Sequence, residues 1–172
     1  MFYFYAMETA FIPSPLGITK IEGDENGIAV ICCASSSVAL ESVLSEGKAT
    51  QKIPVVLQEA VNQLREYFEG KRTEFTFRLN PQGTDFQQKV WQELLNIPFG
   101  KTTSYMDLSK KLGDVKAIRA VASANGKNPL WIVVPCHRVI GSDGSLTGYA
   151  GGLWRKKWLL EHESPSQQQS LF

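Results

Sequence analysis

Residues 102–129, TTSYMDLSKKLGDVKAIRAVASANGKNP, have the outline of a helix-turn-helix. Ser104, with Asp107 three residues later, is typical of a helix start, because the serine hydroxyl can accept a hydrogen bond from the first turn. Gly113 favours a tight turn, and a second helix is expected over residues 115–125. Two interpretations stay open here: a DNA-binding module, or an ordinary pair of packed helices.

The second expected helix carries one long cation followed by small side chains, RAVASA over residues 119–124. Large polar side chains read the wide major groove of DNA, whereas small ones let a helix backbone approach the narrow minor groove. If the helix binds DNA, its composition therefore favours the minor groove. The alternative is an alanine-rich helix packed inside the protein, with Arg119 in solvent.

A possible nucleophile follows the apolar run of residues 130–135, which we expect to be a buried strand or extended segment. Cys136 comes directly after this run and is followed by His137 and Arg138. A cysteine reacts as its thiolate, which nearby positive charge and hydrogen-bond donors favour. A buried, inert thiol is the alternative. Five glycines in residues 141–152 suit a loop that passes close to a ligand.

The first half of the chain predicts a small sheet with one helix. Residues 9–35 read as three strands, with Asn26-Gly27 at a hairpin turn. Apolar residues at helical spacing predict a helix over residues 57–68, ending before Gly70. Phe75, Phe77 and Leu79 alternate with polar residues over 73–79, which predicts a further strand.

Pro81 and Gly83 mark the expected boundary between two domains. Thr84 with Gln87 then predicts the start of another helix. We also expect a last helix that places Trp154, Trp158 and Leu159 on its core face. The expected parts are an N-terminal α/β scaffold domain over residues 1–82, a C-terminal helix-turn-helix domain over 83–163 and a flexible tail over 164–172.

Composition favours a cytoplasmic protein. The chain has 172 residues and no apolar run near the roughly 20 residues that span a bilayer. The opening MFYFYA is too short for a signal peptide, and Met7 follows it, so the first six residues are interpreted as an alternative start or an extension. An odd count of 3 cysteines gives no disulfide framework, and their spacing predicts no metal site.

The two halves of the chain differ in charge. Residues 1–82 hold 7 Lys+Arg against 10 Asp+Glu, a balance of −3, and residues 83–172 hold 11 against 7, a balance of +4. A basic half suits an anionic partner, although an excess this small is also typical of an ordinary solvated surface.

Several motifs together resemble a known family. PCHRVI, GSLTGYAGGLWRKKWLLEHE, FGKTTSYMDLS and KAIRAVASANGKNP occur in the order and spacing of the active-site domain of O6-alkylguanine DNA alkyltransferases, over residues 86–163. The first half is similar to that family's other domain by size and element order only. The resemblance implies a two-domain α/β fold, with a ribonuclease-H-like N-terminal sheet plus helix and a mainly helical, winged helix-turn-helix C-terminal domain.

The resemblance also implies catalytic roles. Cys136 matches the alkyl acceptor, and His137 would take its proton through a water molecule. Glu163 would hold His137 in the required tautomer. Tyr105 matches the tyrosine that assists the leaving guanine at ring N3, and Asn128 matches the hinge asparagine after the recognition helix.

Further residues match the DNA-binding surface and the base pocket of the family. Arg119 would enter the duplex where the damaged base was, and Val139 would offer its carbonyl to the guanine amino group. Tyr149 would form part of the pocket wall. Many relatives have serine where this chain has Ala150, whose backbone N–H is expected to reach O6. The remaining candidates are Ser104, Lys116, Ala120, Ser123 and Lys127 for DNA, with Lys101, Lys110 and Lys111 as further phosphate contacts, and Pro135 and Gly151 for the pocket.

The implied reaction is direct displacement: the thiolate attacks the alkyl carbon, and restored guanine leaves. The thioether is not readily converted back to the thiol, so one protein molecule is consumed per lesion. No cofactor is needed. The expected partner is double-stranded DNA carrying O6-alkylguanine, with O4-alkylthymine as a second candidate lesion, bound through the minor groove by a monomer. Phosphate contacts should make this binding salt-sensitive.

Three rival functions stay open. An alkyltransferase-like protein would bind the lesion without transfer, but such relatives replace the acceptor, commonly with tryptophan, and this chain has Cys136. A sequence-specific helix-turn-helix regulator would make Cys136 and His137 incidental. A cysteine hydrolase would turn over repeatedly on a peptide or ester.

Overall fold

The fold is taken from a computed structural model that describes residues 6–34 and 52–164. The first five residues and the expected tail, apart from Ser164, lie outside these ranges. The chain divides into two compact units, Met1–Pro81 and Gln82–Phe172.

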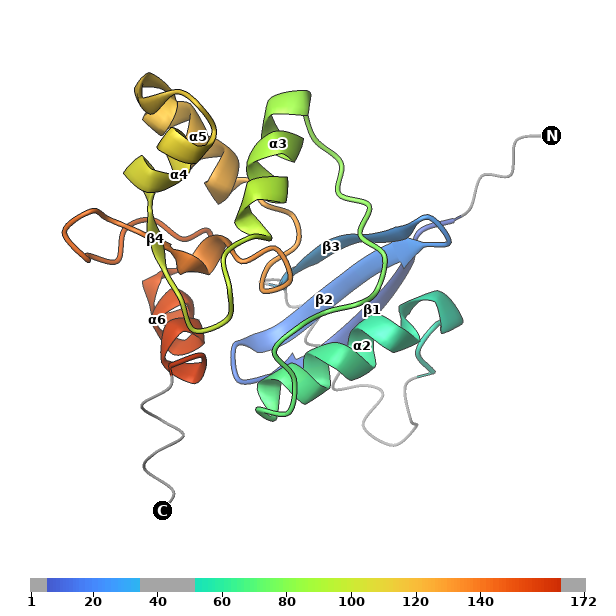
Figure 1. Cartoon of the computed structure of the whole chain (residues 1–172). Coiled ribbons are helices and arrows are strands. Elements are labelled where there is room, and N and C mark those ends of the chain that lie inside the picture. The colour runs from blue at the N-terminus through green and yellow to red at the C-terminus, as the bar shows by residue number, and fades with distance from the viewer. Residues whose placement is uncertain (1–5, 35–51, 165–172) are drawn as a thin grey trace, which may run out of the picture. The chain divides into compact units, whose positions relative to one another are not determined.

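The first unit is a three-stranded antiparallel sheet with one helix against it (Figure 1). Its strands pair in the order β1-β2-β3, and α2 packs against β1 and β2. Buried side chains of these elements form its core, among them Ile12, Ile21, Leu57, Leu64 and Tyr67. The elements are β1 (Glu8–Ser14), β2 (Gly17–Asp24), β3 (Gly27–Cys33) and α2 (Val55–Phe68).

The turn between β2 and β3 is formed by Glu25 and Asn26, one residue before the expected Asn26-Gly27 pair, since Asp24 pairs with Gly27. Gly27 has a φ of 135°, and a Cβ atom there would lie 2.8 Å from the carbonyl oxygen of Arg78. Only glycine therefore allows this close approach without a shift of the backbone. The helix α2 begins two residues before the expected start and ends, as expected, before Gly70.

The strand expected over residues 73–79 is wrong except at its end, where Leu79 forms an isolated bridge with Ile28. A side chain of α2 takes the place of a strand partner. The Gln63 Oε1 accepts from the Thr76 backbone N–H at 2.9 Å, and the Gln63 Nε2 donates to the Thr76 hydroxyl at 2.7 Å. The alternating phenylalanines pack as an aromatic cluster, in which Phe75 contacts both Tyr67 and Phe77.

The second unit is mainly helical (Figure 1). Its short strands pair in parallel, Thr103 with Val139 and Ser104 with Ile140, and so place the start of α4 beside the segment after Cys136. The elements are α3 (Asp85–Leu94), β4 (Thr103–Ser104), α4 (Tyr105–Lys111), η1 (Val115–Ala117), α5 (Ile118–Gly126), η2 (Cys136–Arg138), β5 (Val139–Ile140) and α6 (Leu153–His162).

The expected helix starts of this unit are confirmed by side-chain caps. Thr84 and Gln87 form a reciprocal capping box at α3, and the Ser104 hydroxyl accepts from the Asp107 backbone N–H at 3.0 Å at α4. The second helix of the helix-turn-helix differs from expectation in its first turn, which is a 3-10 helix. There the Asp114 carboxylate accepts from the Lys116 backbone N–H at 2.8 Å, which favours a tight local turn.

The buried segment before Cys136 is a series of turns and not a strand. The Asn128 side chain supplies the hydrogen bonds that a neighbouring strand would have made. Its Nδ2 donates to the Val134 carbonyl at 2.7 Å, and its Oδ1 accepts from the Leu130 backbone N–H at 2.9 Å. Ile132 has a φ of 76°, a left-handed conformation that a β-branched residue adopts only under strain.

Candidate active site

Cys136 is the first residue of η2, and its side chain is almost fully buried, with 4% exposed. Burial raises the pKa of the Cys136 thiol to about 11, although a hydrogen bond with Asn128 and the nearby charge of Lys156 oppose this rise. The sequence suggested that His137 and Arg138 would favour the thiolate, but the largest effect is desolvation, which favours the thiol. The resting thiol is protonated and needs a base.

His137 lies against Glu163, with 2.8 Å between the imidazole Nε2 and the carboxylate Oε1. Burial lowers the pKa of His137, an effect that the contact with Glu163 partly offsets. An ionised carboxylate accepts hydrogen bonds only, so Nε2 carries the proton and Nδ1 has a free lone pair. Within residues 6–34 and 52–164, Nδ1 is buried and has no hydrogen-bond partner. The ring is a neutral base with one available nitrogen.

Arg138 holds Glu163 from its other side and does not act on the thiol. Its Nε donates to the Glu163 Oε2 at 2.8 Å and its Nη2 to Oε1 at 3.0 Å, while Nη1 donates to the Ile97 carbonyl at 2.6 Å. Burial raises the pKa of Glu163, but the hydrogen bonds and charges of His137 and Arg138 outweigh it and hold this pKa at about 2. Glu163 is therefore ionised although it is buried.

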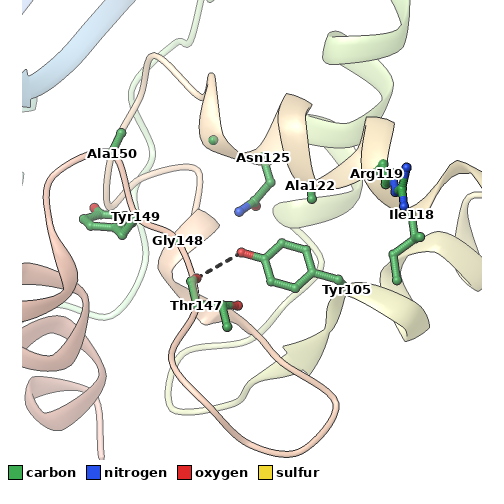
Figure 2. A pocket seen from close by; sticks show the side chains of 10 residues that line it. Tyr105, Ile118, Arg119, Ala122, Asn125, Thr147, Gly148, Tyr149 and Ala150 are labelled. Atoms are coloured by element: carbon green, nitrogen blue, oxygen red, sulfur yellow. Dashed lines mark hydrogen bonds between the residues drawn. The ribbon is translucent and has the colours of Figure 1, made fainter.

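A cavity of about 580 Å³ lies in the second unit (Figure 2). Tyr105 and Tyr149 both line it, and the Tyr105 hydroxyl donates to the Thr147 carbonyl at 3.4 Å. Figure 2 shows side chains from α4, α5 and the loop before α6 around one hollow. The lining residues are Tyr105, Ile118, Arg119, Ala122, Asn125, Gly126, Thr147, Gly148, Tyr149 and Ala150.

Cys136 lies next to this cavity but is not part of its lining. Its backbone carbonyl accepts from the Nδ2 of Asn125 at 3.5 Å, and its thiol is near enough to Tyr105 to raise the pKa of that phenol.

Three residues expected in the pocket lie outside the lining that the structure describes: Pro135, Val139 and Gly151. Pro135 and Val139 are buried behind it. Gly151 acts through packing, because a Cβ atom there would lie 2.8 Å from the Trp131 ring and 3.0 Å from the Tyr149 ring. Glycine at this position lets the wall of the cavity lie against Trp131.

The outer side of α5 exposes three of the residues that are expected to contact DNA. Arg119, Ala120 and Ser123 are exposed, whereas Val121, Ala124 and Asn125 are buried. The Trp91 indole N–H donates to the Ala124 carbonyl at 2.9 Å and so fixes α5 on α3. Lys116 and Lys127 are exposed at the two ends of the helix, and Ser104 is half-buried at the start of α4.

Sequence reasoning missed the role of Lys156, because it assigned Trp154 to the core face of α6. Trp154 is 54% exposed, and Lys156 is fully buried. Its Nζ donates to the carbonyls of Val139 at 2.6 Å and Thr147 at 2.9 Å. A signal was present: Lys156 shares one helix face with Leu159 and Glu163, at spacings of three and seven residues. Asn125 was missed too, and it gave no comparable signal.

The fold and site define a DNA-alkylation repair protein with a cysteine acceptor, and comparison with known proteins identifies the family. The model of the 6-O-methylguanine DNA methyltransferase DNA-binding domain matches residues 85–165, and that of its ribonuclease-like domain matches residues 7–81. The chain belongs to the 6-O-methylguanine DNA methyltransferase family, whose members repair DNA by direct reversal of the damage.

Individual relatives agree. A methylated-DNA--protein-cysteine methyltransferase of Methanosarcina barkeri is 42% identical over 152 residues, which cover 88% of this chain and 94% of the relative. A relative of the same name from Mycobacterium tuberculosis is 54% identical over 110 residues, 64% of this chain and 67% of that protein. The crystal structure of the Mycobacterium tuberculosis enzyme in complex with DNA superposes with a TM-score of 0.76 at 40% identity, covering 94% of this chain and 98% of the other.

In residues 6–34 and 52–164, no helix is both long and apolar enough to cross a membrane.

Proposed function

We propose that this protein removes alkyl groups from O6 of guanine in double-stranded DNA by transferring them to the sulfur of Cys136. The observation that carries the proposal is a buried set: a thiol, an adjacent neutral imidazole, and a carboxylate 2.8 Å from the far nitrogen of that imidazole. This is the arrangement of nucleophile, base and orienting group that activates a weak nucleophile.

His137 acts as the base. A water molecule relays the thiol proton to its Nδ1, because Nε2 is held by Glu163. The imidazolium that forms is stabilised by the carboxylate beside it, and Arg138 keeps that carboxylate ionised. Because the pKa of Cys136 is high, the thiolate forms only when His137 takes its proton during the reaction. At other times the protonated sulfur reacts little with other electrophiles.

The thiolate then displaces the base. The sulfur forms a bond to the alkyl carbon as the bond between that carbon and O6 breaks, and the electron pair passes into the purine ring. The Asn128 amide and the Lys156 ammonium both favour negative charge on this sulfur. The product thioether holds no ionisable proton, so each molecule acts once.

Tyr105 and the loop before α6 take part on the side of the base. Burial raises the pKa of Tyr105, so its phenol is protonated at neutral pH and can donate to N3 of the leaving guanine. The backbone N–H of Ala150, in the cavity wall, would contact O6. The Val139 carbonyl accepts from Lys156 and keeps a second lone pair for the guanine amino group, although Val139 lies behind the cavity lining and would have to become accessible to the bound base.

The target base has to leave the duplex to reach the cavity, at a cost of a few kcal/mol. Arg119, exposed on α5 at the cavity, would occupy the space left behind. The small exposed side chains of Ala120 and Ser123 allow this helix to approach a minor groove closely. Lys116 and Lys127 would contact phosphates at either end of the helix. We propose that a monomer binds in this way, and a reduced thiol suits a cytoplasmic location.

Mass spectrometry tests the proposal. After incubation with duplex DNA that contains O6-methylguanine, we expect one added methyl group on Cys136 and none on a Cys136→Ser variant. An unmodified wild-type thiol would overturn the proposal, and tight binding without modification would favour a non-catalytic binder or regulator. Repeated turnover on an ester would favour a hydrolase.

A further inference from the structure

Asn125 is a buried polar residue of the cavity wall to which the proposed reaction gives no role. It is 4% exposed, and its Nδ2 donates a long hydrogen bond to the Cys136 carbonyl at 3.5 Å. Among the described residues, its Oδ1 has no hydrogen-bond partner. Burying an amide with so few partners costs free energy, so a purely structural role accounts poorly for it.

The Asn125 amide faces the Tyr105 hydroxyl. Figure 2 shows the Asn125 side chain pointing from α5 toward the end of the Tyr105 ring, with Thr147 on the other side of that hydroxyl. The bond from Tyr105 to the Thr147 carbonyl is long, at 3.4 Å, and leaves the phenolic oxygen able to accept. Burial raises the pKa of Tyr105, and hydrogen bonds with the side chains of Thr147 and Asn125 oppose that rise. Only a donor to the phenolic oxygen lowers the pKa of a phenol, so Asn125 acts through its N–H.

We propose that Asn125 is a positioning residue for Tyr105: its amide N–H donates to the phenolic oxygen and directs the phenolic proton toward a base in the cavity. The same N–H stabilises the phenolate that forms when this proton has been transferred. The inference rests on the proposed alkyl transfer.

The proton balance of the step shows why such a donor is useful. The base leaves with the electron pair of its broken bond to the alkyl group, and its N3 takes the proton of Tyr105. A phenolate then lies in a half-buried site until the proton that His137 took from Cys136 returns to it through water. In total one proton moves from the thiol to the base.

Asn125 supplies its hydrogen bond without adding charge. The ionisable groups around Tyr105 are the Cys136 thiol, the Lys156 ammonium, 5.9 Å from the centre of the tyrosine ring, and the Arg119 guanidinium in the same cavity wall. An amide does not titrate, so this donor is present at every pH at which the other groups change state.

The first test measures the pKa of Tyr105 itself, by NMR of the full-length protein with carbon-13 in its tyrosine rings. The Asn125→Leu substitution removes the hydrogen-bond donor and keeps a similar side-chain volume. The Tyr105→Phe substitution identifies the NMR resonance of Tyr105. We expect Asn125→Leu to raise the pKa of Tyr105 by about one unit, a tenfold change in the ionisation constant. The matched control, Asn96→Leu, changes an exposed asparagine at the end of α3 and should leave this pKa unaltered.

An unchanged pKa of Tyr105 in a folded Asn125→Leu protein would overturn the inference. If that variant does not fold, Asn125→Asp keeps the shape, removes the donor and should raise the pKa of Tyr105 at least as far. A pKa that stays at the wild-type value in Asn125→Asp would overturn the inference equally.

The second test is a double-mutant cycle on transfer from free O6-benzylguanine. We expect Asn125→Leu to slow the wild-type protein about tenfold, in line with a one-unit pKa change, and to have no effect in the Tyr105→Phe background. Equal slowing in both backgrounds would show that Asn125 does not act through Tyr105. Absence of transfer by the wild type would instead refute the proposed function, and the NMR result would still decide the contact.

Discussion

The Lys156 ammonium lies 2.6 Å from the carbonyl oxygen of Val139 and joins two parts of the active-site unit that are far apart in sequence. Its second bond, to the Thr147 carbonyl at 2.9 Å, reaches the residue that also accepts from Tyr105. Burial lowers the pKa of Lys156, and the nearby Cys136 opposes that change. One buried cation therefore fixes the loop at the cavity and places positive charge near the sulfur.

Replacing Lys156 by methionine should lower both stability and reactivity. The change removes the Lys156 hydrogen bonds to the Val139 and Thr147 carbonyls and leaves Thr147 only its long bond from Tyr105, so we expect a loss of about 2 kcal/mol in the free energy of unfolding, measured with urea. Alkylation of Cys136 should also slow, because the charge that favours the thiolate is gone. Lys157→Met, at an exposed neighbour, is the control. A Lys156→Met protein as stable as the wild type would show that the two carbonyls find other donors.

Replacing Glu163 by glutamine should reduce alkyl transfer far more than binding to DNA. Glutamine cannot stabilise an imidazolium as a carboxylate does, and disruption of comparable triads costs on the order of 10⁴ in rate. The change also leaves Arg138 buried without its counter-charge, at about 3–5 kcal/mol. Single-turnover rates and urea unfolding measure the two effects. Glu161→Gln, which changes an exposed carboxylate two residues earlier, should alter neither.

Stability should fall as the pH is lowered through the acid range. Glu163 has a folded pKa of about 2, below its ordinary value, so its contribution is present above about pH 4.3 and is lost as the pH falls toward 2. The folded pKa of His137 is also lowered, and this adds a loss that begins as the pH falls below about 6.5. Urea unfolding at a series of pH values measures how steeply the free energy of unfolding changes with pH. This slope should be shallower in Glu163→Gln. An identical slope in the two proteins would contradict the assigned pKa of Glu163.

Raised pH should weaken the fold through Cys136. Its folded pKa of about 11 lies above the ordinary value, so the unfolded chain loses this proton first and stability falls as the pH rises above about 8.5. Cys136→Ser removes the effect, and parallel alkaline profiles of the two proteins would contradict the raised pKa.

Alanine at Gly151 should disturb the cavity wall with a smaller effect on the rest of the fold. The added Cβ would lie 2.8 Å from the Trp131 ring, so the ring or the loop has to move. We expect alkyl transfer to slow at least tenfold and Trp131 fluorescence to change. Overpacking of this kind costs about 1–3 kcal/mol. Wild-type transfer rates in Gly151→Ala would show that the wall adjusts freely.

Alanine at Arg119 should separate base flipping from chemistry. Transfer from duplex DNA should decrease much more than transfer from free O6-benzylguanine, because only the duplex loses a stacked base that the guanidinium replaces. Parallel rate measurements on the two substrates provide the comparison. Equal losses on both would remove the proposed role of Arg119 in flipping.

Local sequence determined the helix starts of the active-site unit, the hairpin of the first unit and the order of the reactive residues. Helix caps at Thr84 and Ser104 and the turn at Gly27 depend on residues a few positions apart, so their patterns could be read directly. The motif around Cys136 identified the family for the same reason, because its residues are consecutive.

The tertiary structure decided whatever depends on partners distant in the chain. Residues 73–79 alternate like a strand, but the Gln63 side chain takes their hydrogen bonds, and the Asn128 side chain does the same for the segment before Cys136. Burial keeps the Cys136 thiol protonated, although its neighbours in sequence are basic. Arg138 forms an ion pair with Glu163 and not with the thiol. Desolvation and paired charges arise only when the chain has folded, so composition and spacing could not supply them.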